Sequence, residues 1–315
     1  MKNLAEVETR IMERPAGGTK LTSQVKGKIV EFAWWMKKQG YAESTIIGKM
    51  KLLKILVKRG ANLFDPESLK EAIAQQSTWS NGRKCNAVDA YSSFLEMIGG
   101  KWDPPRYGRI RKLPFIPLEN EIDQLIAGCG KKTATLLQLL KETGMRIGEA
   151  WKLQWTDIDF ISNTIRVTPE KGSNPRIFKA SNKLMAMLTA LQGKSESERL
   201  FGKWVKSLER CFYQQRRTIA NKLKNPRILR ISFHTFRHWK ATMEYHRTKD
   251  ILHVMRVLGH KRIQNTLVYT QLVDLSSDEY VSKVAKTVQE ACQLVESGFE
   301  YVTEMDDLKI FRKPK

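Results

Sequence analysis

Apolar residues recur at helical spacing through the first third of the chain. Val25, Ile29, Phe32 and Met36 lie three or four positions apart, and the pattern stops at Gly40, which predicts an amphipathic helix ended by a glycine. The same spacing predicts three more helices, over residues 45–59, 66–75 and 81–98. Because no alternating apolar and polar run of useful length interrupts them, residues 19–100 are expected to form a helical domain.

The remainder of the chain mixes helices with a short run of strands. Helical spacing returns over residues 119–127, 132–142 and 145–153, and again from Leu184 onward. Segments 155–160, 164–167 and 176–179 have strand character, so residues 155–180 predict a small antiparallel meander. Val281, Val284, Val288 and Val295 recur on one side of residues 278–297, which predicts a further amphipathic helix. The expected fold class is mainly α with a small antiparallel sheet.

Two breaks in the pattern divide the chain into domains. Residues 1–18 form a mixed-charge leader that ends in Pro15-Ala16-Gly17-Gly18. Residues 101–118 hold four prolines and five bases, so they cannot form a regular helix and predict an extended basic linker suited to a phosphate backbone. The expected order is therefore leader, helical domain, linker, a larger domain over 119–297, and a C-terminal tail over 298–315.

The charge of the chain points to a polyanionic partner. The 315 residues include 55 Lys+Arg against 33 Asp+Glu, a net charge of +22, which favours nucleic acid. A lysine-rich solvated surface, as some thermophile proteins have, is the alternative. No run of apolar residues is long enough to span a membrane and the first residues do not resemble a secretory signal. We therefore expect a cytoplasmic, nucleoid-associated protein with no membrane partner.

The cysteines and histidines do not suggest a metal site. The four cysteines are far apart, none forms a Cys-x-x-Cys pair, and the five histidines supply no ligand cluster beside them. Neither a zinc site nor a disulfide framework fits this distribution, whereas reduced cysteines do. Glycine-rich phosphate loops of the GxxxxGK[ST] and GxGxxG types are also missing from the sequence. The chemistry is therefore sought in other residues.

Three basic residues lie where they could bind a phosphate. Arg146 follows Gly144 at the start of a predicted helix, where a cation opposes the helix dipole and so indicates an anionic partner. Taken alone, a structural ion pair with Glu149 explains Arg146 better. His234 and Arg237 lie three apart on one helix face and combine a proton carrier with a guanidinium. A buried structural histidine is the alternative reading of His234.

Three more residues extend this series along the chain. Lys171 lies in the turn 168–175, where a lysine is usually only solvated. His260 follows Gly259 at a predicted helix end, and Tyr269 comes nine residues later in a partly apolar run. A tyrosine in such a run ordinarily serves packing. Each residue is a weak indication of function by itself.

The ordered set is much more specific than its members. The segments R-I-G-E-A, K-G, H-T-F-R-H and L-G-H, followed by Tyr269, resemble the tyrosine recombinases, a family that includes phage-type integrases, Xer proteins and Cre. The match spans residues 143–270. The amino-acid sequences of its motifs, together with the later G-F-E-Y-V, are most similar to those of archaeal integrases. The resemblance implies a two-domain, C-shaped DNA clamp in which a helical domain and a tyrosine recombinase-like catalytic domain enclose duplex DNA.

The resemblance also implies a covalent mechanism. Tyr269 would attack a scissile phosphate, form a 3′-phosphotyrosine and release a 5′-hydroxyl. Arg146 and Arg237 would hold the phosphate oxygens and stabilise the developing charge. Because the covalent bond conserves the phosphodiester energy, neither ATP nor a metal is implied as a cofactor.

The remaining roles concern protons and hydrogen bonds. Lys171 would protonate the leaving 5′-oxygen, with Lys179 as the alternative lysine. His234 would assist proton transfer at the tyrosine, and His260 would donate a hydrogen bond to a non-bridging oxygen. Glu149 would buttress the first arginine of the series.

The expected partner is double-stranded DNA at a specific attachment or recombination site. The residues expected to contact it are Lys49, Arg106, Arg109, Arg111, Arg216 and Arg217. We expect integration or excision of a mobile element by a synaptic tetramer on DNA, with the predicted helix 278–297 docking on a neighbouring copy. Two alternatives are a type IB topoisomerase-like nicking-closing enzyme and a non-catalytic DNA-binding protein on the same scaffold.

Overall fold

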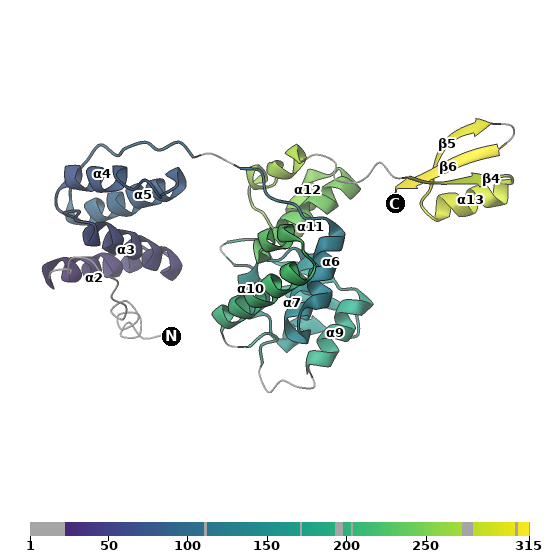
Figure 1. Cartoon of the computed structure of the whole chain (residues 1–315), viewed down its shortest axis with the longest axis horizontal. Helices are drawn as coiled ribbons and strands as arrows, with labels where there is room; N and C mark the ends of the chain where they lie inside the picture. The colour runs from purple at the N-terminus through teal and green to yellow at the C-terminus, as the bar shows by residue number, and fades with distance from the viewer. Residues whose placement is uncertain are drawn as a thin grey trace. The chain divides into compact units, whose positions relative to one another are not determined.

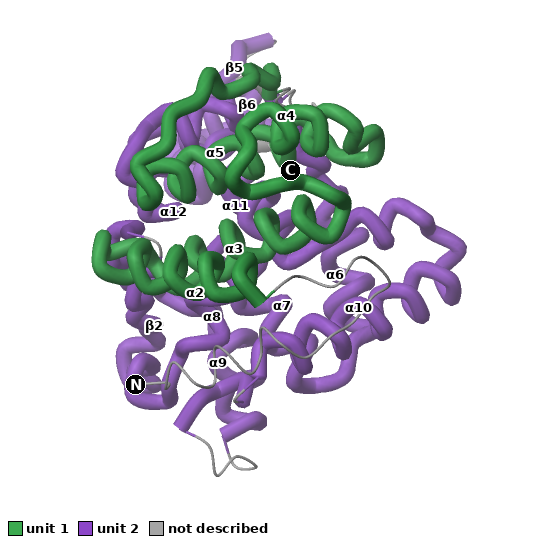
Figure 2. The backbone as a smooth tube through the Cα atoms, turned by 90° about the vertical axis from the view of Figure 1, so that its left-hand side faces the viewer, with its two compact units in different colours: residues 1–112 green, residues 113–315 purple. Residues whose placement is uncertain are grey.

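The computed structural model of the chain divides into two compact units (Figures 1 and 2), residues 1–112 and 113–315. It describes residues 23–109, 112–170, 172–192, 198–202, 204–272, 280–305 and 308–314. The predicted leader therefore lies outside the described residues. The boundary between the units falls inside the predicted linker. No helix within these described ranges is long and apolar enough to cross a membrane.

The described part of the first unit is a bundle of four helices. They are α2 (Ser23–Lys38), α3 (Glu43–Lys58), α4 (Pro66–Ala74) and α5 (Asn81–Ile98). Their bounds confirm the four predicted helices to within a few residues. Side-chain oxygens of Asp65 and Ser80 accept backbone N–H groups at the starts of α4 and α5, which explains why these helices begin where they do. Phe32, Leu53 and Phe94 are buried in the core between the helices.

The predicted linker has no regular secondary structure where it is described, as expected, but it is not free of contacts. The Trp102 ring meets Tyr91 of α5 edge-on with centroids 4.7 Å apart, and its Nε1 donates to Ser92 Oγ at 3.1 Å. On the other side of the unit boundary, Phe115 lies 4.1 Å from the guanidinium of Arg230. Each end of the linker is therefore fastened to its own unit, a docking that its proline-rich composition did not reveal.

The second unit begins with helices around a small sheet. In chain order the elements are α6 (Glu119–Gly128), α7 (Lys131–Thr143), α8 (Ile147–Lys152), η1 (Trp155–Asp157), β1 (Ile158–Asp159), β2 (Thr164–Val167), β3 (Arg176–Lys179), α9 (Asn182–Gln192), α10 (Val205–Lys222), η2 (Pro226–Arg230), α11 (Phe233–Thr248), α12 (Ile251–Leu258), η3 (Ile263–Asn265) and η4 (Leu267–Gln271). The sheet is antiparallel with strand order β1-β2-β3. This confirms the predicted meander, except that residues 155–157 form a 3-10 turn.

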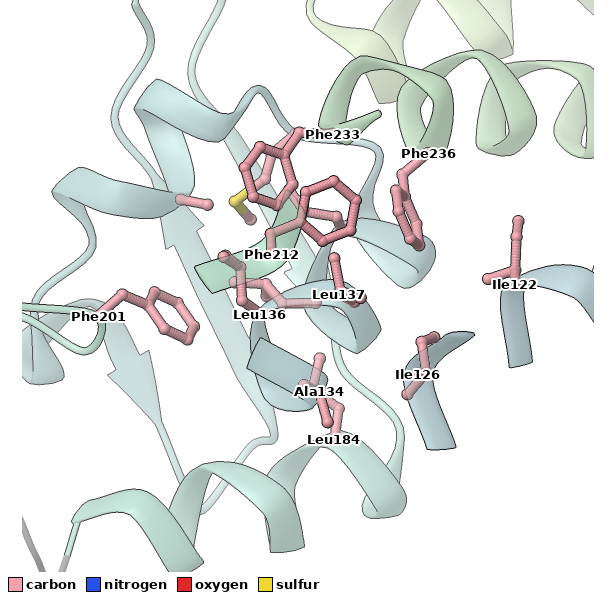
Figure 3. Close-up of a cluster of buried hydrophobic side chains, with 14 of the residues drawn as sticks. Ile122, Ile126, Ala134, Leu136, Leu137, Leu184, Phe201, Phe212, Phe233 and Phe236 are labelled. Atoms are coloured by element: carbon pink, nitrogen blue, oxygen red, sulfur yellow. The ribbon is translucent and has the colours of Figure 1, made fainter. Parts of the chain in front are cut away.

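Helix α7 lies at the centre of the core of this unit. It is buried on all sides, and Leu136 and Leu137 pack among side chains from α6, α9, α10 and α11 (Figure 3). Phe212 of α10 stacks on Phe233 of α11 with centroids 4.4 Å apart. Each buried aromatic side chain of this kind contributes roughly 2–3 kcal/mol. The core therefore fixes α11 against α7, the two helices whose ends carry the candidate site.

The segment after residue 279 differs from the prediction. A single helix over 278–297 is wrong: the structure has β4 (Tyr280–Ala285), α13 (Val288–Glu296), β5 (Glu300–Met305) and β6 (Leu308–Pro314), with sheet order β4-β6-β5. Thr287 Oγ1 accepts the Glu290 N–H as the N-cap of α13, and the Glu290 carboxylate accepts the Lys286 N–H, so the helix begins at 288. Val281 and Val284 instead pair with the distant β6.

We predict that β4 depends on the C-terminal strands. Deleting residues 298–315 removes β5 and β6, so the β4 amides should lose their protection from hydrogen exchange because β6 is the strand that pairs with β4. Hydrogen-exchange mass spectrometry on the full chain and the truncated variant measures this, with the β1-β2-β3 peptides as the unchanged reference. Equal protection of residues 280–285 in both proteins would contradict the pairing.

Candidate active site

Arg146 lies in the turn that joins α7 to α8. Gly144 ends α7 with φ +61°, a conformation that glycine adopts without strain. The Arg146 N–H donates to Glu149 Oε2 at 2.8 Å, and its Nη1 donates to Glu149 Oε1 at 3.1 Å and to Ser173 Oγ. The structural pair with Glu149 is therefore present. The Arg146 side chain still keeps 24% of its surface exposed, so it also faces outward.

The carboxylate of Glu149 is the centre of this group. Its side chain is fully buried, and it accepts Arg176 Nη2 at 2.6 Å in addition to Arg146. Burial opposes ionisation, but the Arg146 N–H and the two guanidiniums outweigh it, so the pKa of Glu149 is lowered. Glu149 is therefore a buried, ionised carboxylate shared by two arginines.

Helix α11 presents two members of the predicted series on one face. Ser232 Oγ accepts the Thr235 N–H at 3.3 Å, and the Thr235 hydroxyl accepts the Ser232 N–H at 3.0 Å. This cap begins the helix at residue 233, so His234 lies in the first turn and Arg237 one turn later. His234 is exposed, whereas Arg237 is only 2% exposed.

Arg237 ties α11 to two other chain segments. Its Nη1 donates to the Gly144 carbonyl at 2.9 Å and its Nη2 to the Leu258 carbonyl at 2.6 Å. Burial, followed by the neighbouring Arg146 and Arg176, lowers the pKa of Arg237 to about 10. Since this pKa is still far above neutrality, the buried guanidinium stays charged.

Arg176 is a third arginine that the sequence did not single out. It begins β3, its side chain is 5% exposed, and its Nη1 donates to the Leu258 carbonyl at 2.5 Å. A Cβ atom on Gly259, whose φ is +65°, would collide with this guanidinium, so glycine is required there. The only signal in the sequence was alternation with the half-buried Phe178 along a four-residue strand, which is too short to separate a functional arginine from a surface one.

These contacts gather three guanidiniums around one carboxylate. Arg146 and Arg176 share Glu149, while Arg176 and Arg237 share the Leu258 carbonyl at the end of α12. Positive charges therefore outnumber negative ones in the group. Cations held this way in a water-poor site attract an anion more strongly than solvated cations do. The group can bind a phosphate.

Tyr269 lies beside this cluster on η4 and is 2% exposed. It packs with Ala241, Val254 and Leu258 of α11 and α12. Its Oη lies 3.0 Å from Nδ1 of His238, a residue of α11 that was given no role from the sequence. Burial raises the pKa of Tyr269 to about 12, although nearby arginines act in the opposite direction. The phenol is therefore protonated at neutral pH and hydrogen-bonded to His238.

His260 is held by the turn that follows α12. Its Nδ1 lies 2.9 Å from Oγ1 of the buried Thr266. Burial, followed by Arg237 and the other arginines, lowers the pKa of His260 to about 4, so the ring is neutral at neutral pH. His234 touches the His238 ring edge-on with centroids 4.5 Å apart. The neutral rings of His238 and His260 thus lie near the arginines.

Lys171 lies outside the described residues, but its chain neighbours are anchored to α8. The Glu170 N–H makes a long hydrogen bond of 3.4 Å to Glu149 Oε1, and Ser173 Oγ accepts from the arginine that precedes α8. Lys179, the alternative lysine, is exposed at the end of β3 away from this turn. The structure therefore places Glu170 and Ser173, the described neighbours of Lys171, against the Arg146–Glu149 pair.

Three of the basic residues predicted to contact DNA make contacts within the protein. Arg109, although exposed, donates to Asn86 Oδ1 at 3.1 Å and lies 3.8 Å from Asp89 Oδ2. Lys49 Nζ donates to Ser93 Oγ of α5 at 2.5 Å. Arg216 Nη1 donates to the Ile231 carbonyl, and its guanidinium lies 4.8 Å from the Tyr213 ring. The exposed members of the set are Arg106, Arg109 and Arg217, while Arg111 lies outside the described residues. The exposed three remain the simplest candidates for phosphate contacts.

Comparison with known proteins identifies the family of the chain. A sequence profile of the phage integrase family matches residues 118–275. The chain belongs to this family of tyrosine recombinases. This recombinase is 27% identical over 245 residues to a tyrosine recombinase of Pseudothermotoga lettingae, covering 73% of this chain and 84% of the relative. It is 29% identical over 204 residues to the tyrosine recombinase XerA of Saccharolobus solfataricus, covering 64% and 67%.

Solved structures share the fold of this recombinase. A lambda integrase dimer bound to a COC′ core site matches with a TM-score of 0.61 and 14% identity, over 88% of this chain and 87% of that one. XerH bound to its difH substrate matches with a TM-score of 0.57 and 18% identity, over 78% and 92%. The family resemblance and the mainly α fold class are thereby confirmed, and neither alternative activity is favoured.

We predict that Glu149 is essential to the stability of this recombinase. Glu149→Gln leaves buried guanidiniums without their counter-charge, so the free energy of unfolding at neutral pH should fall by about 3 kcal/mol or more. Because the folded pKa of Glu149 is lowered, its contribution is present above the unfolded value of about 4.3 and is lost as pH falls through the folded pKa. The difference between the variant and the wild type should therefore shrink in acid.

Urea unfolding followed by tryptophan fluorescence at several pH values measures this difference. Glu31→Gln is the matched control, because Glu31 pairs with Lys28 on an exposed surface, where an ion pair contributes about 0–1 kcal/mol. Equal losses in the two variants would mean that the buried carboxylate does not support the arginine cluster.

Proposed function

We propose that this protein is a site-specific DNA recombinase that cleaves and rejoins duplex DNA through a 3′-phosphotyrosine, with Tyr269 as the nucleophile. The observation that supports the proposal is that Tyr269 and the arginine cluster both contact helix α11 of the same chain. Tyr269 packs on this helix, while Arg237 projects from it toward the partly exposed Arg146. This placement supports attack by the tyrosine of the same chain whose arginines bind the phosphate.

The three arginines divide the work of holding the phosphate. Arg146 is the most exposed and donates to the non-bridging oxygens. Arg237 has given one hydrogen of each Nη to a carbonyl, so it retains donors and its full charge for the transition state. Arg176 acts as a positioning residue, because it spans Glu149 and the Leu258 carbonyl and so joins the other two.

The remaining residues of the series handle protons and hydrogen bonds. Lys171 protonates the leaving 5′-oxygen. His260 donates from Nε2 to a non-bridging oxygen, in the tautomer that accepts the Thr266 hydroxyl at Nδ1. His234 is exposed at the start of α11, where it assists proton transfer at Tyr269. None of these steps needs a nucleotide cofactor.

We infer that the protein acts on specific duplex sites as a tetramer, in the integration or excision of a mobile element. The two units are proposed to form the arms of the clamp. A lambda integrase tetramer bound to a Holliday junction shares this fold, with a TM-score of 0.58. Residues 278–297 are not one helix. We therefore propose that docking on a neighbouring copy uses the C-terminal segment made of β4, α13, β5 and β6.

We predict that Tyr269→Phe abolishes the covalent protein–DNA adduct. The variant lacks the attacking oxygen but keeps the ring that fills the buried site, so folding and DNA binding should survive with about 1 kcal/mol lost for one hydrogen bond. The substrate is a nicked duplex selected from a random pool by its covalent capture on the wild type. A denaturing gel then measures the adduct formed with this duplex. Tyr245→Phe is the control. An adduct in Tyr269→Phe would overturn the assignment.

We predict that DNA affinity falls steeply with salt, with a log–log slope of magnitude roughly 5 or more. Changing Arg106, Arg109 and Arg217 to alanine should reduce that magnitude by about 2 to 3, since each lost phosphate contact contributes about 0.9. Alanine at Lys28 and Lys70, whose ion pairs with glutamates at 2.6 and 3.2 Å are closer than the 3.8 Å pair of Arg109 with Asp89, should change it less. Fluorescence anisotropy across a salt series measures the slope, and a nearly flat dependence would contradict the clamp.

A further inference from the structure

His238 is the side chain that touches the reacting oxygen. Its Nδ1 lies 3.0 Å from Tyr269 Oη, within the range required for direct proton transfer. Building on the proposed function, we propose that His238 Nδ1 is the general base that takes the proton of Tyr269 when its oxygen attacks the DNA phosphate. His238 would then be a catalytic residue in addition to the series found in the sequence.

The protonation states of the pair suit this role. Burial raises the pKa of Tyr269 to about 12, so the phenol keeps its proton and is able to donate it to His238. Burial, followed by the nearby His234 and Arg237, lowers the pKa of His238 to about 4. His238 is therefore neutral at neutral pH. In the tautomer that carries its proton on Nε2, the lone pair of Nδ1 accepts the hydrogen of the phenol.

Neither of the other two site histidines makes this contact. His260 Nδ1 is engaged by the Thr266 hydroxyl at 2.9 Å. The His234 ring packs against His238, with centroids 4.5 Å apart, while the His238 and Tyr269 centroids lie 5.8 Å apart. His238 thus contacts both His234 and the tyrosine, and its Nδ1 is within hydrogen-bond distance of Oη.

Bound DNA would make His238 a better base. The groups that act on its charge are His234 and Arg237 on α11 and the hydroxyl of Tyr269 on η4. A phosphodiester seated on the arginines offsets the positive field that disfavours an imidazolium. Proton uptake is therefore easiest when the substrate is in place.

The proposed step balances as follows. The Oη–H bond of Tyr269 breaks and its proton moves to His238 Nδ1, while the oxygen's electron pair forms the bond to phosphorus. The bond from phosphorus to the 5′-oxygen breaks, and that oxygen takes a proton from the acid assigned to Lys171. On rejoining, the 5′-hydroxyl attacks, Lys171 regains its proton, and the His238 imidazolium returns a proton to the departing tyrosine oxygen.

Two variants separate a base from a mere hydrogen-bond partner. His238→Asn retains a polar group near the position of Nδ1 but cannot take up a proton, and His238→Ala removes the group. Single-turnover adduct formation on the captured nicked duplex should slow by about 100-fold or more in both, with DNA affinity and the unfolding midpoint nearly unchanged in His238→Asn. His253→Asn, on α12 beside Glu244, is the matched control and should react at the wild-type rate.

A more acidic nucleophile gives the decisive readout. A fluorinated tyrosine incorporated at position 269 depends less on a base, so it should restore part of the rate lost in His238→Asn. The gain in that variant should exceed the gain that the same amino acid produces in the wild type. An equal gain in both backgrounds would overturn the role.

Failure of this role is distinguishable from failure of the proposed function. If the wild type forms no adduct, or forms it at a residue other than Tyr269, the proposed function is overturned. The proposed role of His238 as general base is then overturned as well. If the wild type forms the Tyr269 adduct and His238→Asn matches its rate, only the role of His238 is overturned. Faster cleavage by His238→Ala would also overturn it, because His238 would then restrain the tyrosine.

Discussion

The structure of the site depends on the pairing of buried guanidiniums with one carboxylate and one carbonyl. Removing an arginine from water is costly unless its donors are matched. Arg176 meets this condition at its two Nη atoms, which reach Glu149 on α8 and the Leu258 carbonyl on α12 from the start of β3, whereas its buried Nε has no hydrogen-bond partner among the described residues. One side chain therefore fixes three elements relative to each other. The cations are arranged before any anion arrives, which is the condition for electrostatic catalysis without reorganisation.

The same burial has an opposite effect on Tyr269, the proposed nucleophile. A water-poor environment strengthens the field of the arginines, but it also disfavours a phenolate, and the pKa of Tyr269 is raised in spite of Arg237 and Arg146. Positive charge alone therefore does not produce the attacking oxyanion. A proton acceptor has to be within reach, and it has to be neutral at rest. The surroundings of His238, which hold its pKa low, provide such a group.

Local patterns in the sequence predicted local structure well. Helices of the first unit were predicted to within a few residues because apolar spacing and caps act within one or two turns. The contacts that were missed join distant residues: Arg176 and Leu258 are 82 positions apart, and His238 and Tyr269 are 31 apart. The C-terminal helix was over-extended for the same reason, because residues 280–285 pair with a strand that follows much later. Without the family resemblance, residues such as His260 would have stayed ambiguous.

The short motif L-G-H shows what a family resemblance contains that helical periodicity does not. Leu258 supplies its carbonyl to two arginines, and Gly259 supplies the absence of a side chain that lets Arg176 approach. His260 supplies its ring. Only His260 contributes through its side chain. An argument from side-chain chemistry alone therefore identifies His260 and overlooks Leu258 and Gly259. The motif is constrained at all three positions because a backbone acceptor, a space and a ring must occupy consecutive residues at the end of one helix.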